Sequence, residues 1–389
     1  MSALLVLEDE RTFPGEAYGA VGTALGEVVF TTGMTGYQET LTDPSFARQI
    51  VVQTAPHIGN TGVNDEDDES AAVQVAGYVV RDPARVPSNW RSRRRLEDEL
   101  AGYGVVGLSG IDTRALVRHL AARGALRGGV FSGLAATRPV PELVGQVRAS
   151  ASMLGADLVG AVTTTAPYLV PAIGRRRFTV AAVDLGIKAS SPAEMARRGM
   201  DVHVLPATVA IEELFAVGGS GGPDGIFFSN GPGDPATADH PVALASAALA
   251  RGVPVFGICF GNQILGRALG LGTYKLPYGH RGMNIPVRER ATGRVSITAQ
   301  NHGFAVAAPG GGVDRIADSP FGRIEVSHVC LNDGSVEGLR ALDVPAFSVQ
   351  YHPEAAAGPH DANPLFDRFA ELMATNTTDP PTAPTKGER

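Results

Sequence analysis

From residue 178 onward, short apolar runs alternate with segments of helical length. The apolar runs are FTVAAVDLG (178–186), MDVHVLP (200–206), GIFFS (225–229) and VPVFGIC (253–259). Helix-like segments such as PVALASAALARG (241–252) separate them. Buried strands joined by helices form parallel sheets, so we predict an α/β fold with an open, doubly wound, mostly parallel sheet over residues 178–374.

The first half of the chain is predicted to be a β-rich α/β domain over residues 1–150. Its strand-like runs are ALLVLED (3–9), GEVVFTT (26–32) and QIVVQTA (49–55). Helices are predicted at 91–101 and at 112–123, the second capped by Asp112. The arginines at 91 and 93–95 precede three acidic residues, which favours a solvated helix face with i,i+4 pairs over a phosphate site.

Two further segments lack the pattern of a folded domain. Residues 151–177 are rich in Ala, Ser, Thr and Pro and end in three arginines, Arg175–Arg177, so we interpret them as a linker. Residues 375–389 have no apolar periodicity, and we predict a disordered tail there.

Composition restricts the partners and the compartment. The formal net charge is −7 at pH 7, so we expect no nucleic acid partner and no attraction to an anionic membrane. Two cysteines are too few for a disulfide-stapled secreted scaffold. No apolar run approaches the ~18 residues of a membrane helix, and the N-terminus MSALLVLEDERTF lacks the basic region of a signal peptide. We therefore expect a cytoplasmic protein.

The strongest local signal for chemistry is GICFGNQ at 257–263. Cys259 follows a predicted strand and precedes a predicted helix, with glycine two residues before it and two after it. This is the pattern of a nucleophile elbow, in which side chains at the glycine positions would crowd a sharp turn. A buried, inert cysteine is the alternative, but the carboxyl end of a strand in such a sheet is where ligands bind. Cys330 has no such glycines and is predicted to fill a strand.

A cysteine nucleophile needs a base and a group that orients the base. His352 and Glu354 in QYHPE (350–354) can provide both, because residues i and i+2 of an extended segment share a face. The intervening Pro353 biases His352 toward that extended conformation. The tripeptide alone is weak evidence, and it gains weight from the elbow upstream in the same α/β unit.

Two polar, glycine-containing segments complete the pattern. NGPGDP at 230–235 follows a predicted strand, and its glycines would let the backbone approach a ligand. QNHGF at 300–304 lies among predicted strands, and taken alone it does not discriminate between a loop and a ligand contact.

These four motifs, in this order, resemble the class I (triad) glutamine amidotransferase domain over residues 178–373. The segments MTGYQETLTDPSFARQIVVQTAPHIGNTGVN (34–64) and SGIDTRALVRHL (109–120) resemble the N-terminal domain of carbamoyl-phosphate synthase small subunits. The resemblance therefore spans nearly the whole chain. It implies a flavodoxin-like C-terminal sheet and a glutaminase that supplies a synthetase.

The resemblance also implies residue roles. Cys259 would attack the side-chain amide of glutamine, His352 would protonate the departing ammonia, and Glu354 would orient His352. Main-chain N–H groups of Gly233 and Phe260 would stabilise the oxyanion. The residues implied to bind glutamine are Ser45, Gly231, Gly233, Phe260, Gln263, Asn301, Gly303 and Phe304.

The implied partner is the large subunit of carbamoyl-phosphate synthase, which receives the ammonia, with L-glutamine as the substrate and a higher-order assembly of heterodimers as a possibility. No cofactor is expected in this chain, because it has no GxxxxGK[ST] motif and no acidic cluster with magnesium spacing. ATP and Mg²⁺ or Mn²⁺ are expected on the large subunit. The products would feed arginine and pyrimidine synthesis.

Two positions depart from the usual family pattern. Asn262 replaces a common histidine after the elbow, with no consequence evident from sequence, and Tyr351 replaces a common glycine, which would tighten the pocket. Other readings are a glutaminase serving another synthetase, a cysteine peptidase or γ-glutamyl hydrolase, and a silent scaffold. The first two leave the N-terminal segments unexplained, and a scaffold leaves the triad unexplained.

Overall fold

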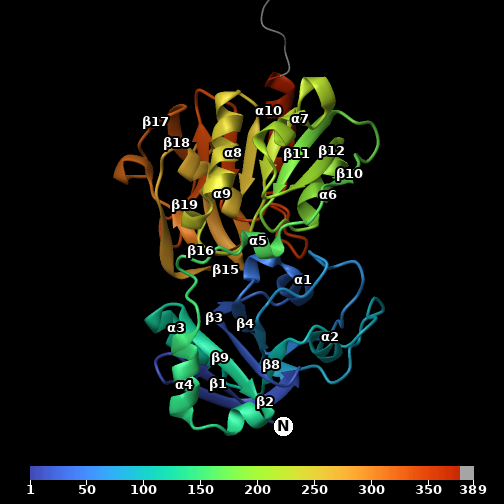
Figure 1. The fold of residues 1–389 in the computed structure, drawn as a ribbon, viewed down its shortest axis with the longest axis vertical. Helices are drawn as coiled ribbons and strands as arrows, with labels where there is room; N and C mark the ends of the chain where they lie inside the picture. The colour runs from blue at the N-terminus through green and yellow to red at the C-terminus, as the bar shows by residue number, and fades with distance from the viewer. Residues whose placement is uncertain (377–389) are drawn as a thin grey trace, which may run out of the picture.

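The computed structural model describes residues 1–376 and shows two stacked parts (Figure 1). The N-terminal part is built around a barrel, and the C-terminal part around a long twisted sheet. In the part of the chain that is described, no helix combines the length and the apolar character needed to cross a bilayer.

The N-terminal sheet closes on itself in the order β1-β2-β8-β6-β4-β3-β9. Its strands are β1 (Ser2–Leu7), β2 (Thr12–Gly19), β3 (Thr23–Thr31), β4 (Gln49–Gln53), β6 (Gly77–Val79), β8 (Val106–Ser109) and β9 (Leu126–Ser132). The pairs β3–β4, β4–β6 and β6–β8 are parallel and the other pairs are antiparallel. The predicted strands correspond to β1, β3 and β4, whereas closure of the barrel was not predicted.

Short helices surround the barrel, and two short strands pair outside it. They are α1 (Tyr37–Thr42), the 3-10 turns η1 (Pro44–Phe46) and η2 (Gly133–Thr137), α2 (Leu96–Gly102), α3 (Thr113–Arg123), α4 (Val140–Ala149), β5 (His57–Ile58) and β7 (Asp82–Pro83). The predicted cap of α3 is confirmed, since the Asp112 carboxylate accepts a hydrogen bond from the Ala115 N–H at 2.9 Å.

The prediction for the arginine run is wrong in part. The helix begins only at Leu96, so the arginines precede it and cannot form i,i+4 pairs along it. Arg94 instead pairs with Glu99 and with Asp65 from a separate loop. Pairing of an arginine before the helix with α2 and with a separate loop therefore replaces the expected helix face.

The C-terminal sheet has the order β10-β12-β11-β13-β14-β20-β19-β18-β15-β16, with β17 paired to β18. Its strands are β10 (Tyr168–Val170), β11 (Phe178–Asp184), β12 (Met200–Pro206), β13 (Gly225–Phe228), β14 (Val255–Ile258), β15 (Thr273–Glu289), β16 (Val295–Val306), β17 (Ala317–Ser319), β18 (Gly322–Cys330), β19 (Val336–Ala341) and β20 (Ala346–Val349). The central strands β12, β11, β13, β14 and β20 are parallel, which confirms the predicted α/β fold, and antiparallel strands extend both sides.

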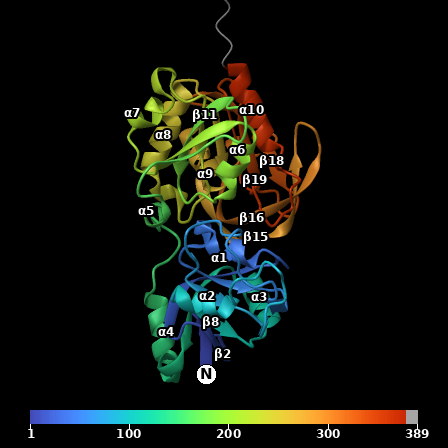
Figure 2. The ribbon, with the colours of Figure 1, turned by 90° about the vertical axis from the view of Figure 1, so that its right-hand side faces the viewer.

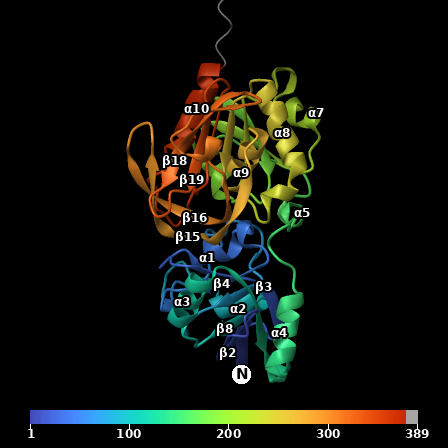
Figure 3. The same ribbon diagram turned by 90° about the vertical axis from the view of Figure 1, so that its left-hand side faces the viewer.

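Helices cover both faces of this sheet (Figures 2 and 3). They are α5 (Val159–Val162), α6 (Ser190–Arg197), α7 (Ile211–Ala216), α8 (Asp239–Ala250), α9 (Phe260–Ala268) and α10 (Leu365–Asn376), with 3-10 turns η3 (Gly219–Gly221), η4 (Pro235–Thr237) and η5 (Pro309–Gly311). The apolar sides of α7, α8 and α9 form one core with the sheet, and those of α6 and α10 form a second core on its other face. Burial on both faces explains the continuous apolar runs of the central strands.

The segments predicted to flank this sheet are more ordered than the sequence suggested. Within residues 151–177, β10 adds an antiparallel edge to β12. Helix α10 continues to Asn376, two residues into the segment predicted as a tail, and the rest of that segment lies outside the described residues.

The two parts meet where α1 and η1 face β15 and β16 (Figure 2). Lys275 of β15 forms an ion pair of 2.6 Å with Glu27 of β3. Asn301 of β16 donates to the Asp43 carboxylate at 3.0 Å. The buried polar contacts make this junction a site where both parts contribute side chains.

Candidate active site

Cys259 occupies the turn between β14 and α9, with a φ of 56°. Positive φ is uncommon for a residue with a side chain and marks a strained turn. A Cβ on Gly261 would lie 2.1 Å from the Phe228 carbonyl oxygen, and one on Gly257 would lie 2.6 Å from the Gly261 carbonyl oxygen. The structure thus confirms the steric reason for both elbow glycines.

His352 and Glu354 form the predicted pair just beyond β20, the strand next to β14. The Nδ1 of His352 donates to Oε1 of Glu354 at 2.6 Å. The other ring nitrogen, Nε2, is buried and has no hydrogen-bond partner among the described residues. It is therefore available for proton transfer.

The charges around the pair act on both pKa values. Burial lowers the pKa of His352, but the Glu354 carboxylate and the nearby Cys259 outweigh this effect and raise it to about 10. Burial raises the pKa of Glu354, yet Lys188 and His352 outweigh it and hold the value at about 2. A cationic imidazole beside a cysteine is the arrangement that favours a reactive thiolate.

Lys188 was not singled out by the sequence analysis, and it lies at the centre of this charge arrangement. Its Nζ is 3.3 Å from Glu354 Oε1 and 3.5 Å from Oε1 of Glu69, which belongs to the N-terminal part. Glu69 also accepts hydrogen bonds from the main chain and hydroxyl of Ser190. The ion pairs therefore connect the catalytic pair to the other half of the chain.

A single cavity contains Cys259 and the residues implied to bind glutamine. All eight residues of that set line the cavity: Ser45, Gly231, Gly233, Phe260, Gln263, Asn301, Gly303 and Phe304. The sulfur of Cys259 lies 3.6 Å from the Asn301 carbonyl oxygen. His352 lines an adjoining cavity that also includes Asn301.

Ser45 reaches this cavity from the N-terminal part through a set of buried hydrogen bonds. Asn230 donates to the Ser45 hydroxyl at 2.9 Å and to the Gly186 carbonyl at 2.8 Å. Asp43 accepts from the Ser45 N–H at 2.9 Å and from Asn301 at 3.0 Å. Asp43 and Asn230 thus hold the pocket wall together across the junction, although the sequence analysis assigned them no role.

Two residues whose main-chain N–H groups are expected to bind an oxyanion, Phe260 and Gly233, line the Cys259 cavity. Phe260 is the first residue of α9, where the N–H has no partner within the helix. Gly233 has a φ of 95°, and a Cβ there would lie 2.6 Å from the Ala156 carbonyl oxygen. Glycine is therefore the residue that fits this backbone on the cavity wall.

Comparison with known proteins agrees with the geometry. Residues 5–130 match the family described as carbamoyl-phosphate synthase small chain, CPSase domain, and residues 181–372 match glutamine amidotransferase class-I. Proteins named carbamoyl phosphate synthase small chain from Streptomyces coelicolor and Streptomyces avermitilis are 66% and 67% identical over 374 residues, covering 95% of this chain and 96% of each relative. One from Mycobacterium tuberculosis is 60% identical over 377 residues, covering 96% of this chain and 98% of the relative.

The chain belongs to the carbamoyl-phosphate synthase small chain family.

The structure explains Asn262, one of the two departures from the usual pattern of this family. Asn262 is fully buried, donates to Gln350 Oε1 at 3.0 Å and accepts from the Ser348 hydroxyl at 2.8 Å. It therefore ties α9 to the strand that leads to His352.

The expectation for Tyr351 is wrong. Its ring packs edge-on against His328, with ring centroids 5.7 Å apart, and lines a different cavity. Neighbouring residues in an extended segment point to opposite sides, so Tyr351 faces away from the pocket that His352 adjoins. Cys330, in contrast, fills β18 as predicted, and burial raises the pKa of its thiol to about 11.

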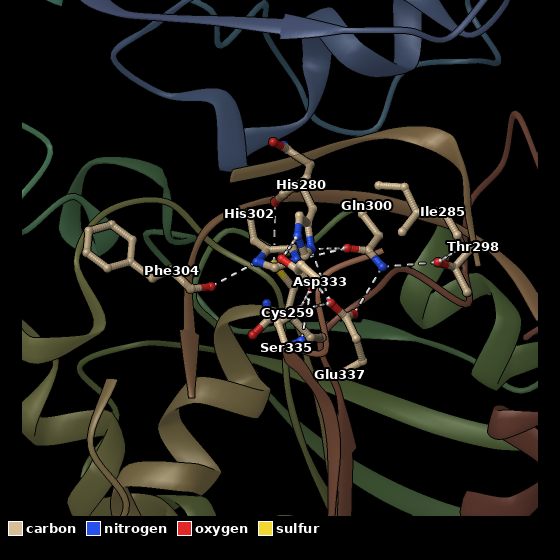
Figure 4. A network of polar contacts seen from close by, with 12 residues as sticks. Cys259, His280, Ile285, Thr298, Gln300, His302, Phe304, Asp333, Ser335 and Glu337 are labelled. Carbon is tan, nitrogen blue, oxygen red and sulfur yellow. Dashed lines mark hydrogen bonds and ion pairs between the residues drawn. The ribbon is translucent and has the colours of Figure 1, made fainter. Parts of the chain in front are cut away.

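A network of polar side chains lies near Cys259 (Figure 4). His280 contacts Glu337 at 3.2 Å and Asp333 at 2.9 Å. Burial lowers the pKa of His280, but these carboxylates outweigh it and raise the value. Atoms of His280, His302 and Glu337 that could ligate a metal ion lie within 4.8 Å of one another. All three residues already form hydrogen bonds within the network.

The network ends at the Cys259 cavity. His302 Nδ1 donates to the Phe304 carbonyl at 2.8 Å, and Gln263 donates to the same oxygen at 2.9 Å. The two bonds hold the main chain around Phe304 against α9. The QNHGF segment is therefore a structured pocket wall rather than a free loop.

Proposed function

We propose that this chain is the glutamine-hydrolysing subunit of carbamoyl-phosphate synthase. It hydrolyses L-glutamine to glutamate and ammonia and delivers the ammonia to the large subunit for carbamoyl phosphate synthesis. The observation that supports this most directly is that Cys259, on its strained elbow, opens into the same cavity as the eight residues implied to bind glutamine.

The first half-reaction forms a thioester. The Cys259 sulfur attacks the side-chain amide carbon of glutamine, and the N–H groups of Phe260 and Gly233 bind the developing oxyanion. The carbon–nitrogen bond then breaks, and the nitrogen leaves as ammonia after taking a proton from His352. A γ-glutamyl thioester remains on Cys259.

The second half-reaction restores the enzyme. Water gives a proton to His352 Nε2 and attacks the thioester carbon, and the carbon–sulfur bond breaks to release glutamate. Glu354 holds the His352 ring through the 2.6 Å bond to Nδ1 and stabilises its cationic form. Glu354 is thus a positioning residue in both steps.

We further propose a division of labour between subunits. ATP and Mg²⁺ or Mn²⁺ act on the large subunit, this chain carries no cofactor of its own, and the product enters arginine and pyrimidine synthesis. We also propose that the complex works in the cytoplasm, has no nucleic acid or membrane partner, and joins its heterodimers into a larger assembly. The absence of a GxxxxGK[ST] motif from the sequence supports the assignment of ATP to the partner.

The test uses the complex of both subunits with ATP and bicarbonate. Cys259→Ser should abolish carbamoyl phosphate formation from glutamine and leave formation from ammonium intact. Cys330→Ser is the matched control, because Cys330 lies in β18 away from the cavity, and it should retain both rates. Loss of both rates in Cys259→Ser would make the residue structural. If the wild type forms no carbamoyl phosphate from either nitrogen source, the chain serves another synthetase.

A further inference from the structure

Arg281 is a buried cation on the wall of the Cys259 cavity, and none of the sequence motifs includes it. It lies on β15, and only 3% of its side chain is exposed. The same cavity is lined by Ser45 and Cys259. Arginine is almost never buried unless it is paired, so its partners need to be identified.

The guanidinium has few partners in the protein. Its Nη1 donates to the Tyr278 carbonyl at 3.1 Å, and its Nε is buried with no hydrogen bond among the described residues. The carboxylate oxygen Glu27 Oε2 lies 3.9 Å from Nη2, beyond hydrogen-bond distance. A guanidinium offers five N–H donors, so most of its binding capacity is unused.

Glu27 is shared between Arg281 and a second cation: its Oε2, which has no hydrogen-bond partner among the described residues, faces Arg281. Its other oxygen, Oε1, is held by Lys275 at 2.6 Å, which leaves two cations beside one carboxylate. Burial lowers the pKa of Arg281, and this effect outweighs the opposing effect of Glu27. The region therefore has an excess of positive charge that an anionic ligand would balance.

The guanidinium also lies close to Gly303 on the cavity wall. A Cβ on Gly303 would lie 3.2 Å from Arg281 Nη2, so glycine leaves the space beside that nitrogen open. Arg281, Gly303 and Cys259 line the same cavity. Arg281 and the reactive sulfur therefore belong to the same small site.

We propose that Arg281 binds the α-carboxylate of glutamine and selects for substrates that carry it. This inference rests on the glutaminase function proposed above. With the side-chain amide at Cys259, the charged end of the substrate needs a partner elsewhere in the cavity. A carboxylate accepting from Nη2 and Nε forms the two-point, charge-assisted contact for which a guanidinium is shaped.

The test compares L-glutamine with its α-amide, which has the same side chain and no α-carboxylate. Arg281→Met should raise KM for glutamine by about 10- to 100-fold, with kcat changed by less than about threefold, as expected for loss of a charge-assisted contact made in ground and transition states alike. Hydrolysis of the α-amide should stay within about threefold. Where its turnover is undetectable, its inhibition constant against glutamine is used instead.

Three controls accompany this comparison. Arg281→Lys keeps the charge without the planar fork and should fall between the wild type and Arg281→Met. Arg288→Met changes an exposed arginine on the same strand and should match the wild type. Ammonium-dependent synthesis by the complex should be unchanged in every variant, which shows that the subunit is folded and docked.

An equal loss for glutamine and its α-amide would overturn the proposal, because it would assign Arg281 a structural role. A loss confined to kcat would also overturn it and would point to an effect on Cys259. Absence of glutamine hydrolysis in the wild type is a different result, which contradicts the proposed function and removes the basis for this inference.

Discussion

Lys188 Nζ lies 3.3 Å from Glu354 Oε1, the same oxygen that accepts the hydrogen bond from His352 at 2.6 Å. One carboxylate oxygen thus serves two buried cations. Because Lys188 also lies 3.5 Å from Glu69, ion pairs link Glu354 and His352 to a residue of the N-terminal part. This relationship suggests how a change at the junction would reach the reacting atoms.

Replacing Lys188 tests that dependence. In Lys188→Met, Glu354 and Glu69 would share a buried region without their cation, so Glu354 should bind a proton more readily and orient His352 less well. We expect glutamine turnover to fall by about 10-fold or more and the free energy of unfolding to fall by about 3–5 kcal/mol. Steady-state kinetics and denaturant unfolding measure the two effects. Arg138→Met, which removes the exposed Arg138–Glu142 pair, should stay within about 0.5 kcal/mol.

The catalytic pair should respond unequally to truncation. In the proposed mechanism His352 transfers protons and Glu354 acts through it, so His352→Ala should slow glutamine turnover more than Glu354→Ala. General acid–base catalysis is typically worth about 10²–10⁴-fold, which sets the scale for the histidine variant. Single-turnover measurement of thioester formation separates this step from product release. Equal losses would mean that Glu354 does more than orient the ring.

Acid should remove the contribution of Glu354 to stability. Its pKa is held at about 2 in the folded protein, below its ordinary value of 4.5. A lowered pKa means that the contribution is fully present above about pH 4.5 and is lost as the pH falls toward 2. The stability difference between the wild type and Glu354→Gln should therefore shrink over this interval. Thermal unfolding at several pH values checks this, and a difference that does not change with pH would contradict it.

Asn262 should matter for folding more than for chemistry. Asn262→Ala would leave the buried Ser348 hydroxyl without its acceptor and Gln350 Oε1 with Gln263 as its remaining donor. We expect a loss of about 1–3 kcal/mol in the free energy of unfolding. Asn262 does not line the Cys259 cavity, so KM for glutamine should change little. A large rise in KM with unchanged stability would show that the residue reads the substrate.

The elbow glycine should be intolerant of even one methyl group. Gly261→Ala would place a Cβ 2.1 Å from the Phe228 carbonyl oxygen, so the turn must shift and glutamine turnover should fall at least 10-fold. Gly145→Ala is the matched control, since it lies within α4 and a Cβ there meets nothing within 4 Å. That variant should be more stable than the wild type by about 0.5–1 kcal/mol, because alanine favours a helix. Equal behaviour of the two variants would argue against the steric account.

What could be predicted from sequence was local. Cys259 was found because its glycines sit two residues away on either side, and the pair His352 and Glu354 because residues i and i+2 share a face. The alternation of apolar runs predicted the parallel core of the C-terminal sheet. The eight pocket residues came from the resemblance to a known family rather than from any periodicity.

Only the tertiary structure decided the contacts between distant segments. Closure of the N-terminal barrel depends on pairing of β1 with β9, whose residues are more than a hundred positions apart in the chain. The role of Lys188 depends on Glu69 and Glu354, and that of Arg281 on Glu27 and Cys259. A charged residue is ordinary in a sequence and becomes informative only when burial removes its water and leaves specific partners. The sequence thus determined the fold class and predicted the nucleophile and its base, while three-dimensional packing decided which buried charges lie beside them.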